Sequence, residues 1–168
     1  MMKTLLTALV LSVGAGTVSS SPALAQMSTA SISKTEFVRM AASGDMYEIE
    51  SSKLALSKSD DASVKELAQM IIKDHMESSK KLMAIAGEKP PTGMDKKHSD
   101  LLEKLKSADG KQFTQLYVSQ QVQAHKEAVD LFERYSKEGE DAQLRTFATE
   151  TLPRLRMHLQ HAQKAQKS

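Results

Sequence analysis

The sequence predicts an all-α protein folded as an antiparallel four-helix bundle. Four segments carry apolar or small residues at alternating steps of three and four, the spacing that lines one side of an α-helix. No segment shows the strict alternation of apolar and polar residues that is typical of a strand. Four amphipathic helices of about 25 residues each bury their apolar sides best against one another.

The first 25 residues have the pattern of a secretory signal peptide. An apolar run follows Lys3, and a small-x-small sequence occupies positions 23–25. The apolar run is too short to span a bilayer, which requires about 20 residues of helix. We therefore expect residues 1–25 to be removed on export to the periplasm or cell envelope, residues 26–32 to form a flexible spacer, and residues 33–166 to form one helical domain.

The composition excludes several classes of function. The chain has no cysteine, which excludes disulfides, thiolate metal ligands and an acylated cysteine. It has 23 basic and 21 acidic residues, and Lys3 is the only charged residue of the signal peptide. Such a balance gives no electrostatic reason to expect nucleic acid or an anionic membrane as a partner. A partner protein of the envelope, or a second copy of the chain, remains open.

The first two helices have recognisable starts. Ser33 and Glu36 have the spacing of a capping box, and so do Ser63 and Glu66. The second helix is expected to run to about Ala86. Mostly small residues mark the inward side of the first helix: Phe37, Ala41, Gly44, Glu48, Ser51 and Ala55.

A longer connection separates the second and third long helices. Residues 87–100 contain two glycines and two prolines, which predicts a loop, and a short amphipathic helix is expected at residues 101–106. The third long helix can begin at Gly110 and stop at Gly139. The fourth can begin after Asp141, which is a suitable N-cap.

Three of the helices each place one histidine on their apolar side: His75, His125 and His158. The first helix places Glu48 there. Because burying an unpartnered polar group costs about 1–3 kcal/mol, these side chains need partners in the core. Three imidazoles with one carboxylate suffice for a four-coordinate zinc, iron or copper ion. His161, one turn beyond His158, is a further candidate ligand.

Other interpretations stay open beside a metal site. A core histidine can be held by a carboxylate in a metal-free polar network, and methionines at helical spacing usually fill gaps in a core. His98 is expected to be solvated in the loop. The sequence has no glycine-rich phosphate loop, no Gly-x-Ser-x-Gly elbow and no His-Glu-x-x-His pattern. The alternatives are a non-enzymatic envelope protein for stress protection or metal buffering, a metal-dependent redox enzyme, and a metal-free interaction module.

Four runs carry a resemblance to a known family: "EFVRMAASGDMYEIESSKLAL", "VKELAQMIIKDHMESSKKL", "FTQLYVSQQVQAHKEAV" and "LRTFATETLPRLRMHLQHA". Together they resemble the exported bacterial family called domain of unknown function 4142. This resemblance implies a ferritin-like four-helix bundle of unestablished function whose motif positions are Glu48, His75, His125 and His158. No histidine here follows a glutamate by three residues, so the Glu-x-x-His pattern of di-iron bundles is missing.

Overall fold

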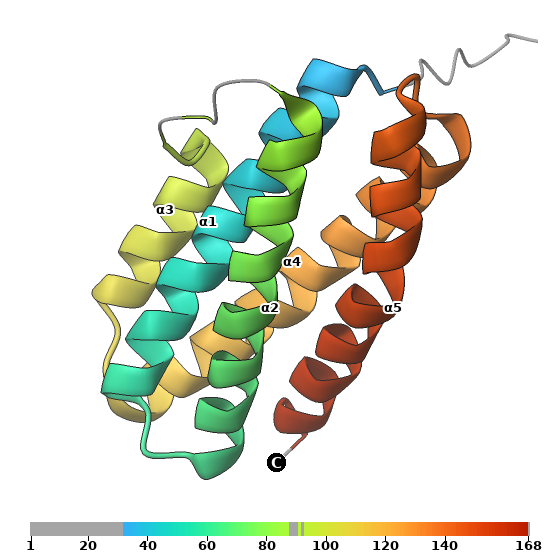
Figure 1. Ribbon diagram of the computed structural model, residues 1–168. Coiled ribbons are helices and arrows are strands. Elements are labelled where there is room, and N and C mark those ends of the chain that lie inside the picture. Colours follow the sequence, from blue (N-terminus) through green and yellow to red (C-terminus); the bar gives the residue numbers. More distant parts are fainter. Residues whose placement is uncertain (1–31, 88–90, 92, 168) are drawn as a thin grey trace, which may run out of the picture.

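The computed structural model describes residues 32–87, 91 and 93–167, so the predicted signal peptide and almost all of the predicted spacer lie outside the described residues. In the described part the chain is all-α, as predicted. No helix there combines the length and the apolar character needed to cross a bilayer. The helices, labelled in Figure 1, are α1 (Lys34–Lys58), α2 (Ala62–Ala86), α3 (Lys96–Lys106), α4 (Gly110–Glu138) and α5 (Ala142–Ala165).

The four long helices contact one another in a ring. α1 packs on α2, α2 on α5, α5 on α4, and α4 on α1. Figure 1 shows that α1 and α5 run in one direction and that α2 and α4 run in the other, so each contacting pair is antiparallel. The short helix α3 lies along α1 on the side away from α5. The middles of the four long helices therefore face a common core.

The start of α1 is as predicted, whereas the predicted start of α2 was wrong. The Ser33 hydroxyl accepts a hydrogen bond from the backbone N–H of Glu36. At α2, Asp61 is the N-cap instead of Ser63, because its carboxylate accepts the backbone N–H groups of Ser63 and Val64. A carboxylate at a helix N-terminus also interacts favourably with the helix dipole, which a serine hydroxyl does less well.

The loop before α3 is shorter than predicted, because α3 begins at Lys96. The Asp95 carboxylate caps this helix by accepting the backbone N–H of His98. Ser43 of α1 holds the cap in place, since its hydroxyl donates to Asp95 Oδ2 and accepts the Asp95 N–H, both at 2.9 Å. His98, predicted to be a solvated loop residue, therefore lies in a helix and is only partly exposed.

The buried hydrophobic side chains form two clusters, and the buried histidines stand between them. One cluster includes Phe37 and Tyr135, and the other includes Ala55 and Tyr117. On each of α2, α4 and α5 the histidine lies between a member of one cluster and a member of the other: His75 between Ile71 and Leu82, His125 between Val122 and Leu131, and His158 between Leu155 and Ala162. The middle of the core is thus a polar layer.

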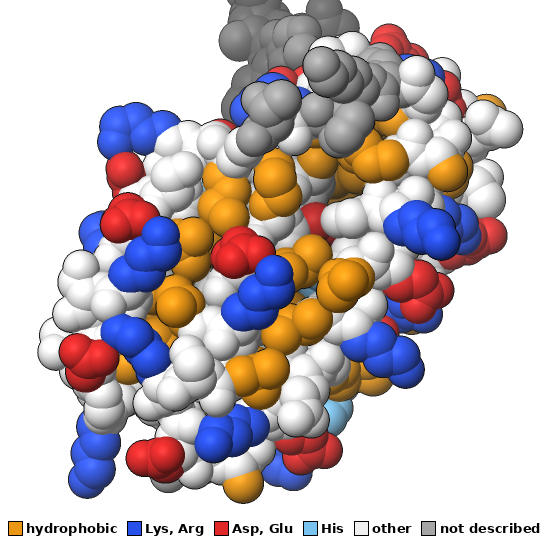
Figure 2. All heavy atoms as spheres, turned by 60° about the vertical axis from the view of Figure 1, so that its left-hand side comes forward, with side chains coloured by type: hydrophobic (Ala, Val, Ile, Leu, Met, Phe, Trp, Pro, Cys, Tyr) orange, Lys and Arg blue, Asp and Glu red, His pale blue; other side chains and the backbone are white. Residues whose placement is uncertain are grey.

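Charged side chains of both signs are mixed over the face that Figure 2 shows, and hydrophobic side chains gather in the middle of that face. No single sign of charge dominates there. The mixture of charges on this face is consistent with the nearly equal numbers of acidic and basic residues in the sequence.

Replacing Gly139 with alanine should destabilise the protein. A Cβ atom at Gly139 would lie 2.5 Å from Cε1 of Tyr135, and the Tyr135 ring is buried and stacked on Phe37 with its centroid 3.9 Å away. Because this ring has little room to move, we expect Gly139→Ala to lower the free energy of unfolding by about 1–3 kcal/mol in denaturant titrations. Gly93→Ala, where a Cβ would have no heavy atom within 4 Å, is the matched control. Equal midpoints for the two variants would contradict the prediction.

Candidate metal centre

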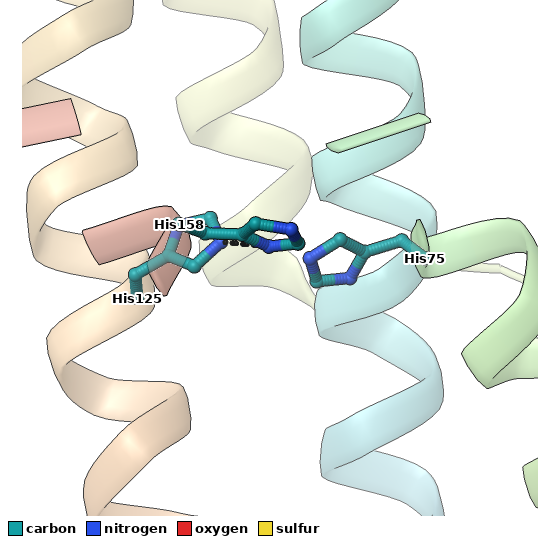
Figure 3. A group of neighbouring side chains, drawn as sticks. All are labelled: His75, His125 and His158. Carbon is teal, nitrogen blue, oxygen red and sulfur yellow. Dashed lines mark hydrogen bonds between the residues drawn. The ribbon is translucent and has the colours of Figure 1, made fainter. Parts of the chain in front are cut away.

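Three histidine rings from three helices meet in the polar layer. Figure 3 shows His75 of α2 facing His125 of α4 and His158 of α5. All three side chains are buried, and one ring nitrogen from each lies within 4.8 Å of the other two. The structure thus brings together the three histidines that the apolar periodicity selected.

The outer nitrogen of each ring is held by a hydrogen-bond acceptor. The three pairs are His75 Nδ1 with Asp45 Oδ1 at 2.8 Å, His125 Nδ1 with the Gln121 carbonyl oxygen at 3.0 Å, and His158 Nε2 with Asp74 Oδ2 at 2.9 Å. Because a carbonyl or a carboxylate can only accept, each outer nitrogen must carry a hydrogen and donate it. Partners of this kind fix the tautomer and the orientation of histidines that bind metals.

The inner nitrogens are left facing one another. His125 Nε2 lies 3.3 Å from His158 Nδ1, and His75 Nε2 has no hydrogen-bond partner among the described residues. In the neutral tautomers fixed by the outer partners, all three inner nitrogens present lone pairs. For metal–nitrogen bonds of about 2.0–2.1 Å, two ligands at a tetrahedral angle lie about 3.3–3.4 Å apart. The inner separation of His125 and His158 fits that geometry.

The pKa values of the three histidines differ. Burial lowers the pKa of His158 to about 4 and that of His125 well below its ordinary value, and the nearby charge of His75 adds to both effects. Burial also acts to lower the pKa of His75, but the hydrogen bond and the charge of Asp45 outweigh it and raise that pKa. Two rings are therefore neutral and ready to coordinate. At His75 a metal ion and a proton would compete for the inner nitrogen.

Glu48 lies beside the centre, outside the group of three. Its side chain is only 5% exposed, and Oε1 is 3.6 Å from Nδ1 of His125, on the outer side of that ring. Oε2 has no hydrogen-bond partner in the described part of the chain, and burial raises the pKa of Glu48 to about 7. Glu48, the candidate ligand on the first helix, therefore lies at the level of the histidines, with its carboxyl group beside the outer nitrogen of His125.

His161, the other candidate ligand, is exposed and is not a member of the group. A step of three residues along a helix turns the side chain about 60° away from the starting direction. On α5 this turn carries His161 out of the core, whereas His158 points into it.

Sequence reasoning did not select the carboxylates that hold two of the rings. Asp45 also accepts a hydrogen bond from the Ser79 hydroxyl at 2.8 Å, so α1 and α2 share one buried acceptor. Its position three residues before Glu48, on the same side of α1, was the available signal. Asp74 is adjacent to His75 in the sequence, but its side chain points towards α5, where it accepts the hydrogen bond of His158. No pattern within α2 alone could show this contact between two helices.

Comparison with known proteins agrees with the helical architecture. The model of a family described as domain of unknown function (DUF4142) matches residues 19–165. A solved structure described as "CopM in the Cu(II)-bound form" is similar to this chain, with a TM-score of 0.67 and 18% sequence identity over 80% of this chain and 96% of that one. At this identity the likeness concerns the fold alone. No curated protein matches the chain.

Proposed function

The chain belongs to the family described as domain of unknown function (DUF4142), and on that premise we propose that it is an exported protein that binds one transition-metal ion at His75, His125 and His158. Export is supported by the signal-peptide pattern of residues 1–25. We also infer that the four long helices form a ferritin-like antiparallel bundle. The ring of antiparallel contacts and the long connection through α3 support this arrangement.

The convergence of the three inner nitrogens is the observation that carries the proposal. In each ring the outer nitrogen donates a hydrogen bond to a fixed acceptor. This bond fixes the orientation of the ring, so the lone pair of the inner nitrogen points toward the other two histidines. A buried lone pair without a donor or a cation beside it is unfavourable, and His75 Nε2 has no partner in the described part of the chain. A metal ion bound to all three nitrogens would satisfy all three lone pairs.

The donor set narrows the choice of ion. Neutral imidazoles suit copper, zinc, nickel and iron, and the chain has no thiolate to offer. The fold likeness to a protein solved in a Cu(II)-bound form makes copper the ion to examine first. Three side chains leave at least one coordination position open. We infer a role in holding and buffering such an ion in the cell envelope.

Titration of the purified protein with Cu(II) should show one tightly bound ion per chain. We expect the electron paramagnetic resonance spectrum of that ion to show coupling to the three imidazole nitrogens, and we expect Zn²⁺ to compete for the same site. Failure of both ions to bind at micromolar concentrations would overturn the proposal. The core would then be a metal-free polar network held by the hydrogen bonds of the three outer nitrogens.

A further inference from the structure

A cavity of about 140 Å³ reaches the centre from the side of α1, α4 and the start of α3. His75, Asp45 and Glu48 line it, and the rest of the wall is mostly small or apolar, with Asp95, Lys97, His98 and Glu127 as the charged or polar members. For comparison, an engineered cavity of about 150 Å³ in another protein holds benzene. The space therefore suits a molecule of up to about six non-hydrogen atoms.

Gly44 keeps this cavity open. It lies inside α1 and lines the cavity, and a Cβ atom there would meet no heavy atom within 4 Å. A glycine inside a helix costs about 0.5–1 kcal/mol relative to alanine. Neither a positive φ nor a close approach of another segment requires a glycine at this position. The effect of the missing side chain is to leave free the space that any other residue would occupy.

Glu48 supplies a hydrogen-bond acceptor on the wall of the same cavity. Its carboxyl group is buried, and Oε2 has no partner in the described residues. A buried polar atom without a partner costs about 1–3 kcal/mol. A guest with an N–H or O–H group would satisfy this oxygen. The cavity wall therefore combines small and apolar side chains with polar groups, and Glu48 is the one among them that keeps an oxygen without a partner in the described residues.

We propose that this cavity admits a small neutral molecule to the open coordination position of the metal centre, with Glu48 Oε2 accepting a hydrogen bond from it. The guest needs one lone-pair atom for the ion and one N–H or O–H donor for Glu48. This inference rests on the proposed function, since without a bound ion there is no coordination position to fill.

A second cavity, of about 80 Å³, reaches His75 and His158 from between α2 and α5. Ion pairs border it, namely Lys81 with Glu150 and Arg154 with Glu77. Most of its lining is polar or charged, whereas the first cavity has more small and apolar side chains beside one ion pair of its own, Lys97 with Glu127. The second cavity reaches the histidines from another side, so a substitution that fills it is a matched control.

Imidazole and 1-methylimidazole, added to the Cu(II)-loaded protein, test the proposal. Both offer a nitrogen to copper, but only imidazole keeps an N–H for Glu48. We expect imidazole to add a fourth nitrogen coupling to the paramagnetic resonance spectrum and to bind more tightly than 1-methylimidazole. Glu48→Leu should remove this preference.

Gly44→Leu should weaken imidazole binding by about 10- to 200-fold, the usual effect of added bulk in a pocket, while the spectrum of the three-histidine site stays the same. Gly44→Ala should give a smaller loss, and Ser78→Leu, in the second cavity, should give none. Unchanged imidazole binding in Gly44→Leu would overturn the inference. Loss of Cu(II) from Gly44→Leu would also overturn the inference, because the cavity would then be needed for binding of the ion itself and not for binding of a further ligand. Absence of Cu(II) from the wild-type protein would instead overturn the proposed function.

Discussion

We expect Cu(II) to raise the melting temperature of the wild-type protein, and replacing His125 with alanine should remove that rise. His125 supplies one of the three inner nitrogens and is fully buried, so no solvent-exposed group can replace it. A ligand that binds only the folded state stabilises it by about 4 kcal/mol at a free concentration 1,000 times its dissociation constant. For a chain of this size, that free energy corresponds to a rise in the melting temperature of roughly 8–16 °C. Melting curves with and without Cu(II) measure the difference.

His161→Ala is the control for this experiment. His161 is a histidine of the same helix as His158, but it is exposed and lies outside the group. We expect its variant to keep the full Cu(II)-dependent rise. If His125→Ala were stabilised as much as the wild type, copper would be bound elsewhere on the protein.

Asp45→Ala should weaken metal binding and also destabilise the metal-free protein. The Asp45 carboxylate accepts hydrogen bonds from His75 Nδ1 and from the Ser79 hydroxyl, both at 2.8 Å. Loss of a residue that orients a ligand usually costs about 10- to 100-fold in metal affinity. Two donors also lose their acceptor in the core, so we expect the free energy of unfolding to fall by about 1–3 kcal/mol without metal. Competition titrations with a copper chelator and denaturant unfolding measure the two effects.

Asp45→Asn separates orientation from charge, because its amide oxygen can still accept from His75. We expect this variant to lose less stability than Asp45→Ala. Asp74→Ala should lower metal affinity through His158 but should destabilise less, since the Asp74 side chain is 12% exposed and water can replace it. Wild-type copper affinity in Asp45→Ala would show that Asp45 does not set the orientation of His75.

The long helices could be predicted from the sequence because their signals are local. Periodicity and caps such as Ser33 and Asp141 act within a few residues, and the structure confirms both caps. The start of α3 could not be found in this way. Asp95 is fixed there by Ser43, which is 52 positions away along the chain, and no local pattern reports such a contact.

The same distinction applies to the candidate site. Periodicity shows which side of a helix His75, His125 and His158 occupy, and this was enough to select the residues that meet. It does not show how far each helix is rotated or shifted against its neighbours. The pairing of Asp74 with His158 across α2 and α5 depends on those quantities, as does the position of Glu48 beside His125.

The three histidines are divided between the two halves of the fold. His75 belongs to the α1–α2 hairpin, whereas His125 and His158 belong to the α4–α5 hairpin. A metal ion bound to all three histidines would join the two hairpins, because they could not separate without breaking a metal–nitrogen bond. Such an ion would act as a cross-link between two parts of the chain that no disulfide can connect, since the sequence has no cysteine.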